Sequence, residues 1–182
     1  MEISDFYPVI AAIRNDEDLE YALESDADII FHLASDILTL KADIEKAHSH
    51  GKKIFVHIDL AEGIGKDASG ISYMKALSTD GIISTRVNLI KTARELGLST
   101  VQRFFIVDSH SIDTTIDAVK SSKPDMVELM PGLLTKVITQ IKKEVRIPII
   151  AGGLIESKSE IISAINAGAD AVSTGKRALW RE

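Results

Sequence analysis

The segment IPIIAGGLIESKSEIISAINAGADAVSTG, residues 147–175, holds the pattern that decides the fold. It starts with a short apolar run ending in two glycines, continues with an amphipathic stretch, and closes with a second apolar run ending in Ser-Thr-Gly. Short, nearly continuous apolar runs are typical of parallel strands covered on both faces, and the stretch between them predicts a crossover helix. The segment is therefore interpreted as a strand–helix–strand unit of a parallel sheet.

The same alternation fills the chain. Eight such strands alternating with helices predict an α/β protein, a small (β/α)₈ barrel forming a single domain over residues 1–182. Barrels of this type usually have ~250 residues, so a doubly wound open parallel sheet with misassigned strands is the alternative. The expected strands are residues 9–14, 28–33, 53–59, 81–85, 101–107, 126–131, 147–153 and 171–175; the expected helices are 15–25, 39–51, 69–77, 88–96, 111–121, 133–145 and 157–167, with a short last helix from Lys176.

Composition narrows the class of protein. Hydrophobic residues make up 45% of the chain, as in globular proteins, and the net charge is −6. The negative charge argues against a surface built to coat nucleic acid, although it allows a local basic patch. The absence of cysteine excludes disulfides and thiolate metal sites. The first residues do not read as a signal peptide, and no apolar run is long enough for a membrane helix, so a cytoplasmic protein is expected.

The end of the chain carries the strongest chemical signal. In β/α barrels, the loops after the last two strands and the start of a short helix form a recurring phosphate site. Glycines let backbone N–H groups approach an anion, and hydroxyl groups add donors. The pattern predicts phosphate binding by Gly152, Gly153, Ser173, Thr174 and Gly175. The alternative is that the glycines only form turns and the Ser-Thr pair only caps a helix.

Polar residues at the ends of the other strands are candidates for the rest of the ligand, because binding residues of barrels lie there. His57 and Asp59 are two residues apart on one expected strand, so both should face the barrel mouth. A metal site is the less favoured interpretation, since no further ligand has suitable spacing. A buried Glu128 needs a partner, which Arg14 or Arg103 can supply. The candidates at strand ends are Arg14, His57, Asp59, Thr85, Arg103 and Glu128.

A glycine loop, AEGIGKD at residues 61–67, resembles part of a P-loop. It lacks the first glycine, because residue 60 is Leu, and Asp67 replaces the Ser or Thr that binds Mg²⁺. We interpret it as a mobile loop in which Lys66 either folds over a bound anion or is a solvated surface lysine. No cofactor or metal is implied.

Signals for catalysis are weak. No lysine ends an expected strand, which disfavours a Schiff-base aldolase, and there is no nucleophile elbow or catalytic triad. The residues leave two functions open: an enzyme such as an isomerase or lyase acting on a small phosphorylated metabolite, and a metabolite-binding module that signals through protein partners. A third, a ligand-gated RNA-binding regulator, follows only from the resemblance described next. The sequence leaves the oligomeric state, including a homo-oligomer, undetermined.

A set of short segments spread over almost the whole chain is fairly specific when taken together. The segments are residues 10–18, 55–60, 62–67, 80–85, 101–103, 108–109, 123–125, 128, 131–132, 148–154, 171–174 and 179–180. In these segments the chain resembles the glycerol-uptake operon antiterminator regulatory proteins of bacteria.

The resemblance implies a regulator that senses glycerol 3-phosphate, binds leader mRNA of glycerol-utilisation genes and prevents transcription termination. The phosphate site expected above agrees with that ligand. RNA binding is implied by the resemblance alone, because aromatic and basic residues are not interleaved in this chain. Two basic clusters are candidates for RNA contacts, with ordinary solvated helix faces as the alternative: Lys142, Lys143 and Arg146, and Lys176, Arg177 and Arg181.

Overall fold

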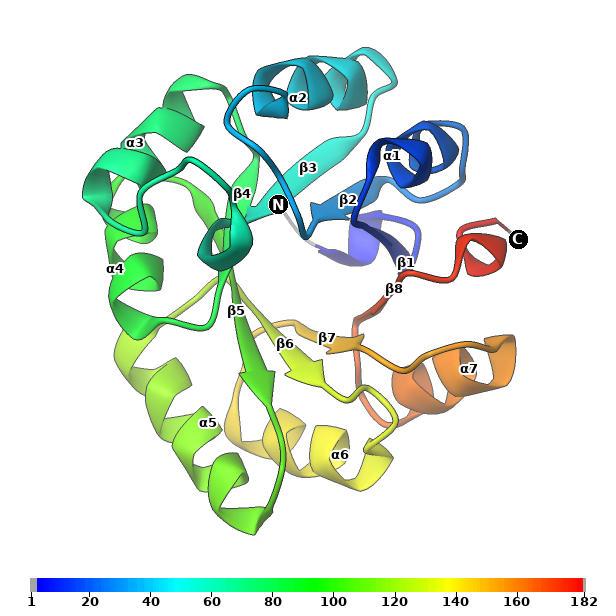
Figure 1. Ribbon diagram of the computed structural model, residues 1–182. Coiled ribbons are helices and arrows are strands. Elements are labelled where there is room, and N and C mark those ends of the chain that lie inside the picture. Colours follow the sequence, from blue (N-terminus) through cyan, green and yellow to red (C-terminus); the bar gives the residue numbers. More distant parts are fainter. Residues whose placement is uncertain (1–2, 182) are drawn as a thin grey trace.

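The structure, a computed structural model that describes residues 3–181, is a closed barrel of eight parallel strands in sequential order (Figure 1). β1 pairs with β2 on one side and with β8 on the other, which closes the sheet. The predicted (β/α)₈ fold is confirmed, and the open-sheet alternative is wrong. The strands are β1 (Val9–Ile13), β2 (Ile29–His32), β3 (Lys53–His57), β4 (Gly81–Ser84), β5 (Ser99–Phe105), β6 (Met126–Met130), β7 (Ile149–Gly152) and β8 (Ala171–Thr174).

Helices follow the first seven strands and surround the barrel (Figure 1). Side chains of Asn15, Asp67, Asp108 and Ser157 accept hydrogen bonds from first-turn N–H groups and so fix four helix starts. The helices are α1 (Asp16–Leu23), α2 (Leu40–Ser49), α3 (Ala68–Ala76), α4 (Val87–Glu95), α5 (Ser109–Ser122), α6 (Thr135–Glu144) and α7 (Lys158–Asn166), with 3₁₀ turns η1 (Ile3–Asp5), η2 (Ile58–Leu60) and η3 (Arg177–Leu179).

The expected last helix is not an α-helix. Up to residue 181, the chain after β8 forms no helix longer than the three-residue turn η3, which begins one residue after Lys176. It is too short to build a helix dipole of the strength that the sequence interpretation assumed. Any anion site at this end of the chain has to rely on individual N–H groups and side chains.

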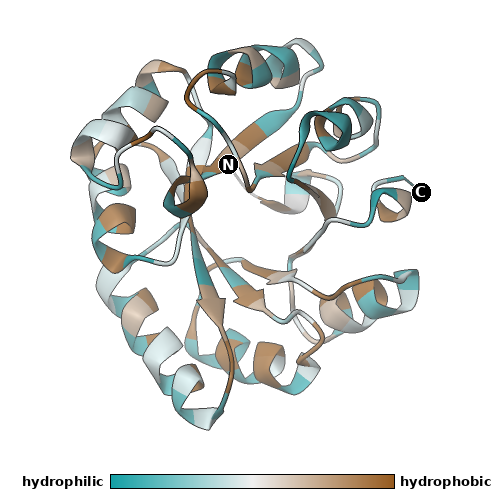
Figure 2. Cartoon of the chain, viewed as in Figure 1, coloured by the Kyte–Doolittle hydropathy of each residue, from teal (hydrophilic) through white to brown (hydrophobic). Residues whose placement is uncertain are grey.

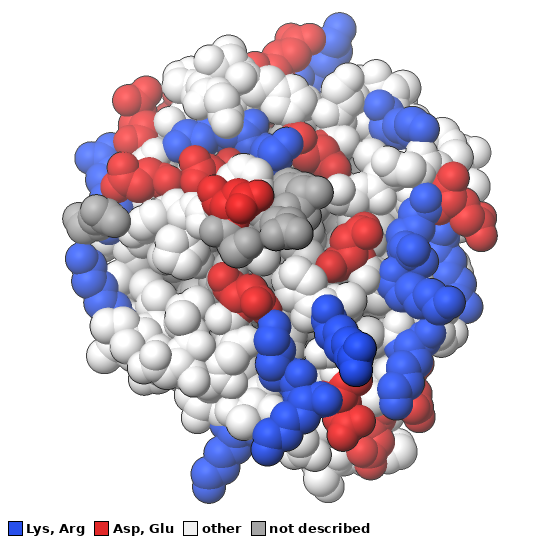
Figure 3. Space-filling view, turned by 180° about the vertical axis from the view of Figure 1, so that it is seen from behind, with Lys and Arg blue, Asp and Glu red and all other residues white. Residues whose placement is uncertain are grey.

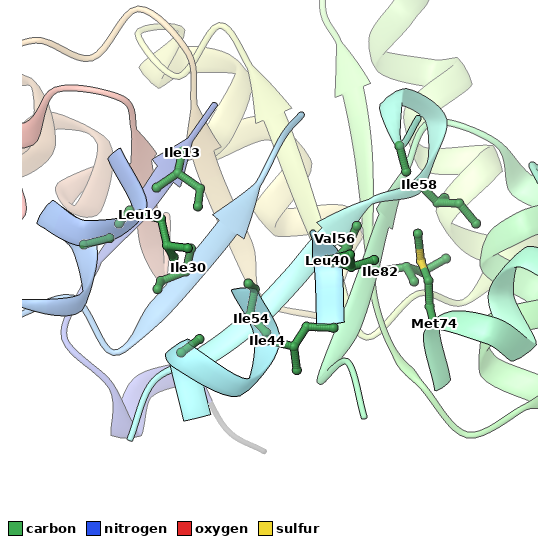
Figure 4. Close-up of a cluster of buried hydrophobic side chains, with 14 of the residues drawn as sticks. Ile13, Leu19, Ile30, Leu40, Ile44, Ile54, Val56, Ile58, Met74 and Ile82 are labelled. Carbon is green, nitrogen blue, oxygen red and sulfur yellow. The ribbon is translucent and has the colours of Figure 1, made fainter. Parts of the chain in front are cut away.

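Buried apolar side chains form three clusters. One cluster fills the barrel interior and includes Phe31 and Phe55, whose ring centroids lie 5.8 Å apart. Two others fill the space between strands and helices. Figure 4 shows the one beside β1–β4, where Ile30 and Val56 are labelled together with Leu40 of α2. The helices carry both hydrophilic (teal) and hydrophobic (brown) residues in Figure 2, as expected for elements with one face buried.

The interior cluster fixes which polar side chains point inward. Side chains of a strand alternate between its two faces, so residues two positions apart share a face. Val101, Met126 and Ala171 belong to the interior cluster. Arg103, Glu128 and Ser173, two residues further along the same strands, therefore extend the interior toward the carboxyl ends of the strands.

Candidate functional site

A pocket of about 320 Å³ opens at the carboxyl ends of the strands. It combines apolar walls with basic and acidic side chains and with backbone from the two loops that follow β7 and β8. Ligand sites of β/α barrels lie at this end. The lining residues are Ala12, Arg14, Leu33, Arg103, Glu128, Met130, Gly153, Leu154, Ile155, Glu156, Ser173, Thr174, Gly175 and Lys176.

Backbone N–H groups form one wall of this pocket. Gly153 and Leu154 have φ angles of 75° and 60°, so the chain turns sharply after β7. A leucine in this conformation is strained, and such strain is concentrated at ligand-binding segments. No hydrogen bond within residues 3–181 engages the backbone N–H of Gly153, Leu154 or Gly175. Free N–H groups on convergent turns are suited to an anion.

The two hydroxyl groups of the predicted phosphate site are already engaged. Ser173 Oγ donates to Glu128 Oε1 at 2.5 Å, and Thr174 Oγ1 donates to the Ile155 carbonyl oxygen at 2.7 Å. Thr174 Oγ1 also accepts from the backbone N–H of Lys176 at 3.0 Å, which shapes the turn after β8. The hydroxyl groups therefore hold the two loops, and the backbone N–H groups are the donors left for a ligand.

Gly152 lies beneath the pocket and does not line it. A Cβ atom at this position would lie 2.4 Å from Glu128 Oε1 and 2.7 Å from Ser173 Oγ. Glycine is therefore needed at residue 152 because the hydrogen bond between Glu128 and Ser173 occupies the space of a side chain. This is a different role from the anion contact that the sequence predicted.

Arg103 and Glu128 form a buried ion pair at the base of the pocket. Arg103 Nε donates to Glu128 Oε2 at 2.5 Å, and the two residues are 6% and 0% exposed. Adjacent positions on β5 and β6 bring them together, since the register pairs Arg103 with Glu128. Of the two partners expected for Glu128, the structure provides Arg103. A buried carboxylate is tolerated because both of its oxygens accept hydrogen bonds.

Two further cations lie at the mouth of the pocket. Arg14 follows β1, Lys176 follows β8, and both are exposed. A Schiff-base aldolase was disfavoured from the sequence because no lysine ends an expected strand. Lys176 weakens that argument, because it lies just beyond the end of β8 and lines the pocket. With Arg103, these side chains give the pocket three cationic groups against the carboxylates of Glu128 and Glu156.

His57 and Asp59 do not share a face. β3 ends at His57, and Asp59 belongs to the turn η2, so the alternation of a strand does not extend to it. Asp59 instead accepts hydrogen bonds from Ser84 Oγ at 2.9 Å and from the Thr85 N–H at 2.7 Å, and lies 3.6 Å from Arg86 Nε. Neither Asp59 nor Thr85 lines the pocket.

His57 is buried and close to the charged pair. Burial, and secondarily the charge of Arg103, lowers the pKa of His57 to about 4, so its imidazole is neutral near pH 7. Its Nδ1 atom has no hydrogen-bond partner among the described residues. His57 lies two residues after the inward-facing Phe55 on β3, so its side chain faces the barrel interior, but it is not among the residues that line the pocket.

Lys66 is bound by its own loop. Its Nζ donates to the carbonyl oxygen of Ile64 at 2.8 Å and to that of Ala61. It does not line the pocket, so in this conformation it does not fold over an anion. No group of three or more His, Cys, Asp or Glu side chains within residues 3–181 is arranged to hold a metal ion.

Pocket residues that the sequence interpretation missed are mostly apolar. Leu33 and Met130 stand at or just beyond the ends of β2 and β6, and Leu154–Glu156 follow the glycines after β7. The rule that strand ends line the site would have found the first two. Only polar residues at strand ends were considered as candidates from the sequence, so the apolar wall of the pocket was not predicted.

The basic clusters proposed for RNA differ in how far they are neutralised. Lys142 Nζ lies 2.6 Å from Asp170, and Arg177 pairs with Glu17 and Asp18 at 2.8 and 2.7 Å. Arg181 donates to the Glu24 carbonyl oxygen. Lys143 and Arg146 have no ion pair among the described residues. Separately, none of the helices within residues 3–181 has the length and apolarity that a membrane crossing requires.

These features define a small single-domain β/α barrel with a charged pocket at the carboxyl ends of its strands. A model of the glycerol-3-phosphate responsive antiterminator family matches residues 9–180, and the chain belongs to this family. The resemblance inferred from the sequence is thereby confirmed, and with it a regulatory class of protein.

Solved and curated relatives support the assignment. The chain is 35% identical to a glycerol uptake operon antiterminator regulatory protein from Listeria monocytogenes, with a TM-score of 0.90 over 94% of each chain. An antiterminator-related protein from Thermotoga maritima is 31% identical, with a TM-score of 0.86 over 96% of this chain and 98% of that one. The uncharacterized protein YgcP of Escherichia coli is 37% identical over 95% of this chain and 91% of its own length.

Proposed function

We propose that this protein binds glycerol 3-phosphate in the pocket, binds leader mRNA of glycerol-utilisation genes in the ligand-bound state, and prevents early transcription termination. One observation carries the ligand proposal: the unengaged N–H groups of Gly153, Leu154 and Gly175 meet at a pocket with three cationic side chains. The phosphate is proposed to lie against these N–H groups, with the glycerol part directed toward Arg103 and Glu128. The RNA step rests on family membership.

Ligand binding can regulate RNA binding only if the ligand prefers one conformation of the protein. The strained turn at Gly153 and Leu154 is a segment whose conformation an anion would stabilise. The proposal requires no metal, cofactor or catalytic step. Glu128 has both oxygens occupied by Arg103 and Ser173, which does not favour a role as general base in an isomerase or lyase.

Titration calorimetry with glycerol 3-phosphate tests the ligand site, with Gly153→Asp as the decisive variant. The added carboxylate opposes the phosphate, and a side chain at a φ of 75° is strained. Binding should be lost. Gly51→Asp is the matched control, because Gly51 also has a positive φ, 71°, has open space around it, and lies after α2 outside the pocket. Unchanged binding by Gly153→Asp would place the phosphate elsewhere.

Leader-RNA binding measured with and without glycerol 3-phosphate tests the regulatory step. The ligand should tighten binding by about fivefold or more, as for a typical coupling free energy. Gly153→Asp should remove the ligand effect. No RNA binding at low salt in either condition would contradict the regulator proposal, and turnover of triose phosphates would favour the enzyme.

A further inference from the structure

The base of the pocket is rich in hydrogen-bond donors yet nearly neutral in charge. Arg103 is 6% exposed and lines the pocket. Its Nε donates to Glu128, whereas its terminal amino groups have no hydrogen-bond partner within residues 3–181. An arginine has several N–H donors in a rigid fork, so a nearly buried one with free amino groups is directed at an acceptor on a ligand.

Glu128 cancels the charge that would otherwise accompany those donors. Its carboxylate lies 2.5 Å from Arg103 Nε and also accepts from Ser173. A neutral hydroxyl group at this end of the pocket can accept from Arg103 without a net electrostatic cost. A carboxylate placed there would approach the like charge of Glu128, which is buried, and this disfavours acidic ligands.

We infer that the Arg103–Glu128 pair makes the pocket selective for a phosphorylated polyol over the corresponding phosphorylated acid. The inference rests on the proposed function in one respect, that the phosphate lies against Gly153 and Gly175. The phosphate then supplies most of the affinity, and the ion pair contacts the opposite end of the ligand and determines which group is accepted there. Specificity arises from a repulsive element, Glu128, as much as from the donors of Arg103.

Two ligands of equal length test this inference. Glycerol 3-phosphate and 3-phosphoglycerate share the phosphate and the central hydroxyl and differ at the terminal carbon, which carries a hydroxyl in one and a carboxylate in the other. Titration calorimetry on the parent should show a preference for glycerol 3-phosphate of about tenfold or more. Equal affinity, or a preference for the acid, would overturn the inference.

Glu128→Gln is the decisive variant. It keeps the shape and an oxygen for Ser173 but removes the charge, so that Arg103 needs an anion. The ratio of the two affinities should move toward 3-phosphoglycerate by about tenfold or more. Glu62→Gln is the matched control, because Glu62 is an exposed carboxylate at the same end of the barrel but outside the pocket. It should leave the ratio unchanged.

A double variant covers the case in which Glu128→Gln does not fold, since an unpaired buried arginine is destabilising. Arg103→Gln with Glu128→Gln leaves no unpaired charge and removes the guanidinium donors. It should bind glycerol 3-phosphate about tenfold more weakly than the parent while binding inorganic phosphate with similar affinity. Parent-like affinity and parent-like selectivity would overturn the inference while leaving the ligand proposal intact. A parent that binds neither three-carbon ligand would contradict the ligand proposal itself.

Discussion

His57 is a buried side chain that should make the stability of the protein depend on pH. Its pKa is lowered from 6.5 to about 4, so the unfolded chain binds a proton before the folded protein does. The free energy of unfolding should therefore fall by up to about 3 kcal/mol as the pH drops from about 6.5 to about 4. Above about pH 6.5, His57 should not make the free energy of unfolding depend on pH. Urea unfolding at several pH values measures it.

The His57→Gln variant should remove this part of the pH dependence, whatever its stability at pH 7, because glutamine does not titrate. His110→Gln is the control, since His110 is an exposed residue of α5. It should retain the parent's loss of stability on acidification. A parent-like pH profile in His57→Gln would show that other groups are responsible.

Asp59 is expected to matter for stability and not for the ligand. Its carboxylate accepts from Ser84 Oγ, Thr85 N–H and Thr85 Oγ1 at 2.7–3.0 Å, which joins η2 to the end of β4. Asp59→Ala should lower the free energy of unfolding by about 1–3 kcal/mol. Its affinity for glycerol 3-phosphate should stay within about twofold of the parent value, because a change of that size is well under 1 kcal/mol. Weaker ligand binding at unchanged stability would contradict this prediction and show that Asp59 contributes to the binding site.

At the scale of elements, the segment after β8 depends on one anchor. Trp180 is fully buried, and its indole N–H donates to the Thr174 carbonyl oxygen at 2.8 Å. Gly175 and Lys176, which line the pocket, lie between these two residues. The position of η3 therefore controls part of the pocket wall.

Trp180→Phe removes that donor and leaves a buried carbonyl oxygen short of a partner, so the free energy of unfolding should fall by about 1–3 kcal/mol. Affinity for glycerol 3-phosphate should weaken in parallel, because the turn at Gly175 loses its support. Tyr73→Phe on α3, a partly exposed aromatic residue, should change stability by less than about 0.5 kcal/mol. Stability lost without any loss of affinity would separate the anchor from the pocket.

The elements could be predicted from the sequence because their signals are local. Apolar runs and capping residues located the eight strands and seven α-helices of residues 3–181, and the glycine pair at 152–153 marked the end of β7. The partners of polar side chains could not be predicted. The separation of His57 from Asp59 depends on β3 ending at residue 57, and the engagement of Lys66 depends on how its loop folds back. Side-chain pairing across strands needs the register, which sequence spacing does not contain.

On the scale of the whole molecule, charge is unevenly distributed despite the net value of −6. Figure 3, which views the face opposite to that of Figure 1, shows Lys and Arg atoms gathered along its lower part and right side, with acidic atoms among them. Three neighbouring helices carry basic residues near this face: α4 has Lys91 and Arg94, α5 has Lys120, and α6 has Lys143, with Arg146 just beyond its end. Such a surface can attract an RNA backbone locally although the protein is acidic overall.

The last prediction concerns this surface and the proposed RNA. Lys143 and Arg146 lie at the end of α6 and just beyond it, and neither is neutralised by an acidic partner within the described residues, unlike Lys142 and Arg177. Their reversal to glutamate should weaken leader-RNA binding by about tenfold. The slope of log K against log salt concentration should become less steep by roughly 1–2, since about two phosphate contacts are lost. Affinity for glycerol 3-phosphate should be unchanged, because the pocket lies at the other end of the barrel.

The control for this prediction carries the same change in net charge. Lys41→Glu with Lys158→Glu places both reversals on α2 and α7, away from the end of α6. If this control weakens RNA binding as much as the reversal at Lys143 and Arg146, the effect is one of overall charge, and the RNA surface lies elsewhere. A third outcome is that only Lys142→Glu and Arg177→Glu weaken binding. The ion pairs of Lys142 with Asp170 and of Arg177 with Asp18 must then break when RNA binds, and these two residues belong to the RNA interface. A loss confined to the reversal at residues 143 and 146 would place the RNA on the end of the barrel remote from the ligand, so that regulation has to pass through the packed strands and helices between them.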